Sequence, residues 1–158
     1  MGRPWVLDYD TASCTIGTTI GIIGEKWTFL VLREVFNGVR RFDDMQRRTR
    51  APRQVLSDRL ARLVAQGLLR KVPYQEHGQR SRQEYRLTEA GLDLYPVMVA
   101  LMQWGDRHAA GPAGPPALLT HRDCGEPVRL ELTCAAGHKL ASAREVTPLP
   151  GPGARKIA

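Results

Sequence analysis

The segment from Pro52 to Gln66 carries apolar residues with the spacing of one helix face. They recur at i, i+4, i+7 and i+8, at Leu56, Leu60, Leu63 and Val64. Pro52 suits a first helical turn and Gly67 is a typical stop, so the pattern predicts a helix between them. Its polar face carries Arg53, Gln54, Ser57 and Asp58, with Arg59 and Arg62 beside them. Such a face fits a DNA-recognition helix, because arginine forks fit guanine edges and glutamine amides fit adenine edges. A solvated, charged face is the alternative.

Shorter elements flank this helix. Residues 27–36 form a largely apolar run that predicts a buried helix, and Phe42 and Met45, with basic residues after them, predict a short second helix. Residues 49–51 would then be the turn of a helix-turn-helix motif. Downstream, residues 68–74 and 83–87 read as strands. The polar tip between them contains Gln79, Arg80, Ser81 and Arg82, which predicts a basic wing that contacts DNA.

Positive charge is concentrated in the same region. Thirteen Lys and Arg and five Asp and Glu lie between Arg40 and Arg86, a net charge of +8, whereas the rest of the chain sums to −1. Concentrated positive charge attracts a polyanion through released counterions, which favours double-stranded DNA as the partner. The alternative is a winged-helix protein-interaction module that docks an acidic partner. Gln54 and Ser57 among arginines favour DNA, since base edges use amides and hydroxyls.

Residues 89–108 are predicted to form one long helix after a Thr88 cap, with Pro96 kinking it without ending it. Its apolar residues fall on two faces, and a helix packed only against its own domain needs one. One face, together with residues 6–23, is therefore predicted to be a dimer interface, with a fully buried helix in a monomer as the alternative. That face consists of Leu92, Tyr95, Val99 and Met102, and the opposite face of Leu94, Met98, Leu101 and Gly105.

Short motifs occur in a fixed order between Cys14 and about His108. They are Gly24–Thr28 (GEKWT), Leu32–Glu34, Arg41–Phe42, Val55–Leu60 (VLSDRL), Gly67–Leu68, Glu84–Thr88 (EYRLT), Gly91 and Trp104–Gly105. This set resembles the HxlR-type winged helix-turn-helix transcription regulators of the MarR-like superfamily. The resemblance implies an α+β fold, a winged helix-turn-helix with flanking dimerisation helices, to which this chain adds a small C-terminal β appendage. It also implies a homodimer that binds operator DNA, usually as a repressor, in response to a small molecule or a reactive electrophile. A two-fold protein is expected to read a pseudo-palindromic operator.

The chain departs from this family at two places. Members commonly carry Ser where Pro52 stands, so the usual side-chain cap of the recognition helix is absent. Many members also have a short wing with paired prolines, whereas residues 78–82 form a longer and more basic tip. The base preference of other members therefore cannot be transferred to this chain.

Cys14 stands at the predicted start of the first helix. Several HxlR-type members that respond to quinones, aldehydes or hypochlorite place their sensing thiol there, so Cys14 is a redox-sensing candidate. A helix N-terminus favours the thiolate, which is the nucleophile. Thr15 and Ile16 replace the proline that commonly follows, and an inert, buried cysteine is the alternative. A rival trigger is an unknown small-molecule effector in an apolar pocket at the dimer interface, lined by Trp27, Tyr95 or Trp104.

The predicted organisation is an N-terminal arm (1–13), the winged-helix and dimerisation domain (14–110), a Gly- and Pro-rich linker (111–116), a β-hairpin appendage (117–147) and a disordered tail (148–158). Apolar and polar residues alternate over 128–134, which predicts a strand. The strand is flanked by His121 and Cys124, and by Cys134 and His138, a spacing that could hold a structural zinc. Packing residues without a metal are the alternative, and no other cofactor is expected.

Size and composition limit the remaining classes. A chain of 158 residues with 42% hydrophobic residues can bury one proper core. The longest uncharged stretch, residues 11–24, is too short to span a bilayer, and residues 1–10 lack an export signal, so we expect a cytoplasmic protein without a membrane partner. No residue pattern is typical of a catalytic centre, so the chain is not expected to be an enzyme.

Overall fold

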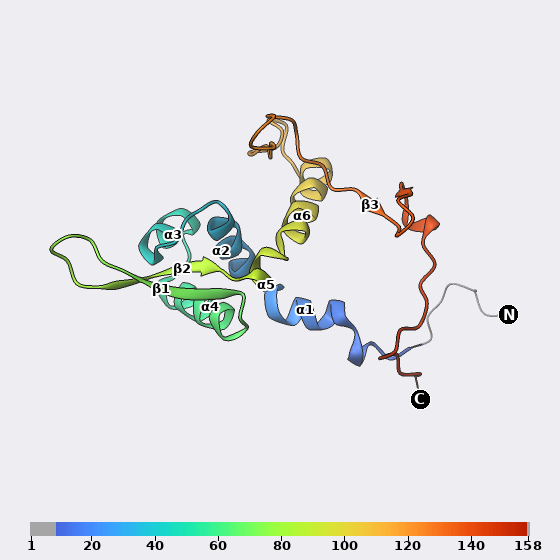
Figure 1. The fold of residues 1–158 in the computed structure, drawn as a ribbon, viewed down its shortest axis with the longest axis horizontal. Coiled ribbons are helices and arrows are strands. Elements are labelled where there is room, and N and C mark those ends of the chain that lie inside the picture. Colours follow the sequence, from blue (N-terminus) through green and yellow to red (C-terminus); the bar gives the residue numbers. More distant parts are fainter. Residues whose placement is uncertain (1–8, 158) are drawn as a thin grey trace. The chain divides into compact units, whose positions relative to one another are not determined.

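The computed structural model describes residues 9–157 and divides the chain into two units. Residues 15–98 form one, called here the winged-helix unit, and residues 9–14 and 99–157 form the other, called the terminal unit. The boundary at Met98 therefore lies inside the segment that was expected to be one domain. The winged-helix unit contains α1 (Thr15–Ile23), α2 (Lys26–Phe36), α3 (Phe42–Thr49), α4 (Arg53–Ala65), β1 (Leu69–Tyr74), β2 (Arg82–Leu87) and α5 (Glu89–Leu92) (Figure 1).

The core of the winged-helix unit forms around α2. Thr28, Val31, Leu32 and Val35 are buried at spacings of three and four residues, which makes one continuous stripe. Leu56, Leu60 and Leu63 of α4 and Met45 of α3 join the same cluster and are almost completely buried. The predicted stripe of the recognition helix is thus confirmed as its core face, and the opposite, polar face of α4 is left to solvent.

The turn between α3 and α4 is held by local hydrogen bonds. Thr49 donates its hydroxyl to the Met45 carbonyl at 2.7 Å and accepts from the Ala51 amide at 3.2 Å. Arg50 follows in the left-handed conformation, with φ of 58°, which ends α3 and redirects the chain. Pro52 is the N-cap residue of α4, and because it has no polar side chain, the helix start lacks a side-chain cap hydrogen bond.

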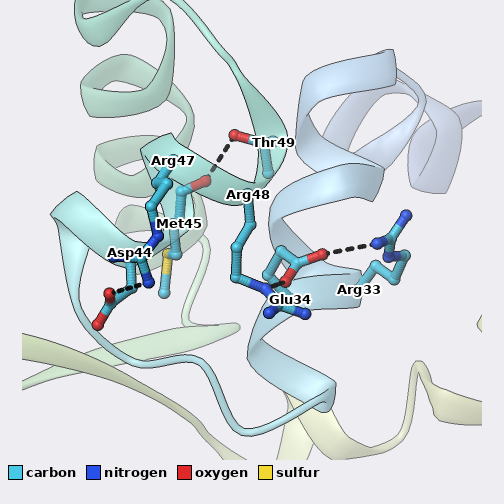
Figure 2. A network of polar contacts seen from close by, with 7 residues as sticks. All are labelled: Arg33, Glu34, Asp44, Met45, Arg47, Arg48 and Thr49. Carbon is cyan, nitrogen blue, oxygen red and sulfur yellow. Dashed lines mark hydrogen bonds and ion pairs between the residues drawn. The ribbon is translucent and has the colours of Figure 1, made fainter.

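A buried carboxylate joins α2 to α3 (Figure 2). Glu34 of α2 is 1% exposed and pairs with Arg33 of its own helix at 2.9 Å. Its second oxygen accepts from Nε of Arg48 of α3. Buried charges are retained only when they are paired, so these contacts keep the two helices together.

The two strands form an antiparallel hairpin, the wing, which projects beyond the helices of its unit (Figure 1). Leu69 pairs with Leu87 at its base and Tyr74 with Arg82 at its outer end. Arg41, which precedes α3, forms a further antiparallel bridge with Glu84 of β2. The connection from α2 to α3 is therefore attached to the wing, so the helix-turn-helix and the wing have a defined relation.

The prediction of a single kinked helix over residues 89–108 was wrong. α5 ends at Leu92, and α6 (Tyr95–His108) begins after a two-residue turn. Pro96 lies in the first turn of α6, where its missing N–H is tolerated, but it cannot donate to the Leu92 carbonyl and so cannot continue α5. Gly91 is required in α5 because a Cβ there would lie 2.2 Å from the Leu68 carbonyl oxygen.

The terminal unit contains η1 (Thr11–Ser13), α6 from Val99 onward, β3 (Leu132–Thr133), β4 (Lys139–Leu140) and η2 (Ala143–Glu145). Only residues 132–133 of the strand predicted over 128–134 form a ladder. Upstream, the Gln103 side chain of α6 donates to the Val128 carbonyl at 2.9 Å and accepts from the Leu130 amide at 3.1 Å. In the tail that was expected to be disordered, Lys156 forms a bridge with Tyr9.

Candidate nucleic-acid interface

The N-terminal half of α4 exposes the side chains that were expected to read DNA. Arg53, Gln54, Ser57 and Asp58 are all exposed on the side of the helix opposite its buried leucines. Gln54 donates its amide to the Asp58 carboxylate at 2.9 Å, one helical turn away. The start of α4 therefore presents a guanidinium, an amide and a hydroxyl together, which is the chemistry of base-edge and phosphate contacts.

Arg59 and Arg62, which were predicted to lie beside the DNA-facing residues, both contact a residue outside α4. Both pair with Glu25, the residue before α2, at 2.5 Å for Arg59 and 3.3 Å for Arg62. The Arg59 side chain is only 20% exposed, and its Nε is a buried nitrogen without a hydrogen-bond partner among the described residues. Arg59 therefore stabilises the packing of α4 beside the start of α2, whereas Arg62 stays 55% exposed. The Glu25 pairing could not be read from helical spacing, because it joins residues more than thirty positions apart.

The wing exposes its whole tip. The exposed residues are Gln79, Arg80, Ser81 and Arg82. Gly78 has a φ of 77°, a left-handed backbone conformation that glycine adopts without steric cost. Gln75 donates its amide to the Gln79 carbonyl at 2.8 Å and closes the loop. The wing thus carries two arginines at a solvent-exposed, basic hairpin tip, as predicted.

A polar hollow of about 480 Å³ lies between the starts of α3 and α4 and the wing. Its walls are Arg41, Phe42, Asp43, Asp44, Arg53, Tyr74, Arg82 and Gln83. Asp43 is shared by Arg53, at 3.6 Å, and Arg82, at 4.0 Å, which shows that the recognition helix and the wing present their arginines side by side. Arg41 and Asp43 were not among the DNA-binding residues predicted from the sequence; the available signals were that Arg41 lies in the basic stretch and in one of the family's motifs.

Arg41 is fixed by two neighbours at this hollow. It pairs with Glu76 of the wing at 2.5 Å, and its guanidinium lies 4.5 Å from the centre of the Tyr74 ring. The hydrogen bond with Glu76 raises the pKa of Arg41 above its ordinary value. Arg41 therefore acts as a permanently charged connection between the α3 start and the wing.

The predicted dimer residues divide into two groups. Leu92 and Tyr95 are exposed and Met102 is half-buried, but Val99 is only 4% exposed within one chain. Val99 is thus the one predicted interface residue that is almost completely covered by its own chain. Leu94 and Met98 of the opposite face pack against the core of the winged-helix unit. Besides Tyr95, α6 exposes Val97, Leu101 and Trp104, which recur at i, i+4 and i+7.

The remaining candidates lie outside this interface. Cys14 is half-buried and directly precedes α1, the position that was expected for it. Among the zinc candidates, His121 Nδ1 lies 3.2 Å from Cys124 Sγ, and Cys134 Sγ lies 3.5 Å from His138 Nδ1. Each pair is assembled by its own turn. Within residues 9–157, no three His, Cys, Asp or Glu side chains gather as a metal site would require.

The family is decided by a match of residues 22–111, more than half of the chain, to the HxlR-like helix-turn-helix family. The chain belongs to that family. Relatives that match the chain include the uncharacterized HTH-type transcriptional regulator Rv3095 of Mycobacterium tuberculosis, which is 48% identical over 139 residues, 88% of this chain and 87% of the relative. The HxlR-like chain described here is thus a transcription regulator with a helix-turn-helix DNA-binding domain. None of the helices described over residues 9–157 is long and apolar enough to cross a membrane.

Solved structures agree with this assignment. The candidate transcription factor PA1607 superposes with a TM-score of 0.79 at 34% identity, covering 89% of this chain and 96% of that chain. The redox regulator HypR in its reduced form has a TM-score of 0.53 at 27% identity and covers 58% of this chain and 90% of its own. The expectation of a winged helix-turn-helix in the α+β class is therefore confirmed.

Proposed function

We propose that this HxlR-like protein is a homodimeric, sequence-specific repressor that binds a pseudo-palindromic operator and is released by a small-molecule or electrophile signal. The observation that carries the DNA-binding part is the shared Asp43 contact of Arg53 and Arg82. It supports a single DNA-facing surface, on which α4 enters the major groove and the wing lies along the backbone. A protein-interaction module would not need the exposed amide and hydroxyl of Gln54 and Ser57 beside these arginines.

Exposed apolar side chains support the dimer. α1 exposes Ile16 and Ile20, at 70% and 59%, and α6 exposes Leu101 and Trp104, at 50% and 58%. Apolar residues at helical spacing on solvent-facing helices are typical of surfaces that a second subunit covers. A two-fold dimer would place two recognition helices about one helical turn of DNA, or a multiple of it, apart.

Selection of bound fragments from genomic DNA, followed by footprinting, tests this function. We expect an enriched pseudo-palindrome, and tighter binding to it than to scrambled duplex by a factor of about 10³ or more. Binding to all duplexes with equal affinity would contradict sequence-specific regulation, and protection of a single half-site by a monomer would contradict the dimer.

Gln54 and Arg80 should behave differently on that operator. Gln54→Ala should cost about 1 to 3 kcal/mol of binding free energy at one base position, because a base contact is lost. Arg80→Ala should weaken binding to every sequence alike and reduce the salt slope by about one ion, because a phosphate contact is lost. Titrations of operator and scrambled DNA at several salt concentrations measure both effects. Equal losses on both DNAs for Gln54→Ala would count against base reading.

We propose Cys14 as the sensor of an electrophile or oxidant, in keeping with its position before α1 and with the likeness to the redox regulator HypR. Cys14→Ser should bind operator normally in the absence of oxidant and keep its affinity after hypochlorite or quinone treatment, whereas the wild type should lose it. Cys124→Ser and Cys134→Ser are the matched controls. A Cys14→Ser protein that responds like the wild type would assign the signal to another group.

A further inference from the structure

The hollow at the wing contains an incompletely neutralised pair of arginines. Asp43 is the only carboxylate among residues 9–157 that pairs with Arg53 or with Arg82, and it serves both. The other aspartate of the hollow, Asp44, is occupied by Arg47 at 2.7 Å. Two guanidinium groups thus face one carboxylate, so one positive charge inside the hollow has no carboxylate to neutralise it, although Arg53 also lies over the Phe42 ring at 4.8 Å.

The contacts of Asp43 are also loose. Hydrogen-bonded pairs of guanidinium and carboxylate have N–O distances of about 2.7 to 2.9 Å, whereas Asp43 lies 3.6 and 4.0 Å from its partners. Asp43 and Arg53 are each 71% exposed, and Arg82 is 59% exposed, so water screens both pairs. An anion with better geometry can therefore replace Asp43 without disturbing a buried structure.

We propose that a phosphate of the DNA backbone binds in this hollow between Arg53 and Arg82, and that Asp43 sets the affinity of the complex by competing for the same two guanidinium groups. A phosphodiester carries one negative charge and two free oxygens, which matches the unneutralised charge and the two guanidinium groups. The hollow, at about 480 Å³, is large enough for it. The inference rests on the proposed DNA-binding function. It assigns to Asp43 the role of lowering the affinity for DNA, although Asp43 itself makes no contact with the phosphate.

The test compares full-length variants on a 20-base-pair duplex of mixed sequence, by fluorescence anisotropy in about 0.1 M NaCl. Asp43→Asn should bind about 3- to 10-fold more tightly than wild type. The carboxylate that competes for the guanidinium groups is gone, and so is its repulsion of the nearby phosphate. Two variants control for net charge. Asp44→Asn, one residue away, and Asp93→Asn, at the end of α5, should each gain less than about 2-fold. Thermal unfolding of each variant should show an unchanged fold, because Asp43 is exposed.

A double-mutant comparison separates competition from general electrostatics. In a protein that carries Arg53→Gln and Arg82→Gln, the Asp43→Asn substitution should tighten binding by less than about 2-fold, as in the control aspartate variants, because neither guanidinium that Asp43 pairs with remains. Unchanged or weaker binding by Asp43→Asn, equal gains in all three aspartate variants, or a gain of full size in the Arg53→Gln and Arg82→Gln background would each overturn the proposal. If the wild type binds its selected operator while Asp43→Asn shows no gain, only the phosphate site fails. If the wild type binds no duplex, the proposed function fails with it.

Discussion

Replacing Arg33 and Arg48 together with alanine should lower the free energy of unfolding by about 2 to 4 kcal/mol. The substitutions would leave the Glu34 carboxylate, 1% exposed, without either of its charged partners between α2 and α3. Stranding a buried charge costs about 3 to 5 kcal/mol, and we take a lower value because both arginines are about half exposed. Urea unfolding of the purified variant measures the change through its midpoint at constant slope.

Glu34→Met is the matched control for that prediction. It replaces the carboxylate by an apolar side chain of similar size and removes the need for partners, so it should cost less than about 1.5 kcal/mol. A double arginine variant as stable as the wild type, or a Glu34→Met protein that unfolds more readily than the double variant, would show that the carboxylate is not paired as Figure 2 depicts.

Leu101→Asp should convert the protein from a dimer to a monomer and reduce operator affinity by about 100-fold or more. Leu101 lies in the exposed stripe of α6 between Val97 and Trp104. In a two-fold dimer the substitution buries two carboxylates against apolar surface, which costs several kcal/mol of association free energy. Each factor of ten in affinity corresponds to about 1.4 kcal/mol. Sedimentation velocity measures the subunit number, and anisotropy measures the affinity.

Leu118→Asp provides the control, because Leu118 is 79% exposed and lies outside the helices. It should leave both the subunit number and the DNA affinity unchanged. A Leu101→Asp protein that remains dimeric would place the dimer interface elsewhere. A Leu101→Asp protein that becomes monomeric yet retains full operator affinity would contradict binding of the operator by a two-fold dimer.

The spacing of apolar residues was sufficient to predict the helix-turn-helix motif from the sequence. α2 and α4 bury residues at the spacings that their apolar patterns predict, and the tip between β1 and β2 is as polar and basic as a wing requires. These elements could be predicted because each is stabilised by a stripe or turn within its own segment. The order of the elements then restricted the fold to one class.

Features that depend on distant partners could not be predicted in this way. The alternation over residues 128–134 is real, but much of its hydrogen bonding comes from the Gln103 side chain, for which alternation carries no signal. Arg59 fits a DNA-facing position by spacing, and the spacing gives no signal for its ion pair with Glu25. The break before α6 was misjudged for a different reason, since Pro96 is compatible both with a kink and with a new helix start.

The hydrogen bond between Gln54 and Asp58 has a consequence for base preference. An ionised carboxylate can only accept, so the contact uses one of the two N–H donors of the Gln54 amide and turns that end toward Asp58, which leaves Oε1 uncommitted. In the major groove, adenine and cytosine offer an amino group that can donate to such an oxygen, whereas guanine and thymine offer a carbonyl oxygen at the corresponding place. A single turn of α4 thus orients the amide before any DNA arrives, and if Gln54 reads a base as proposed, this orientation favours adenine or cytosine opposite it.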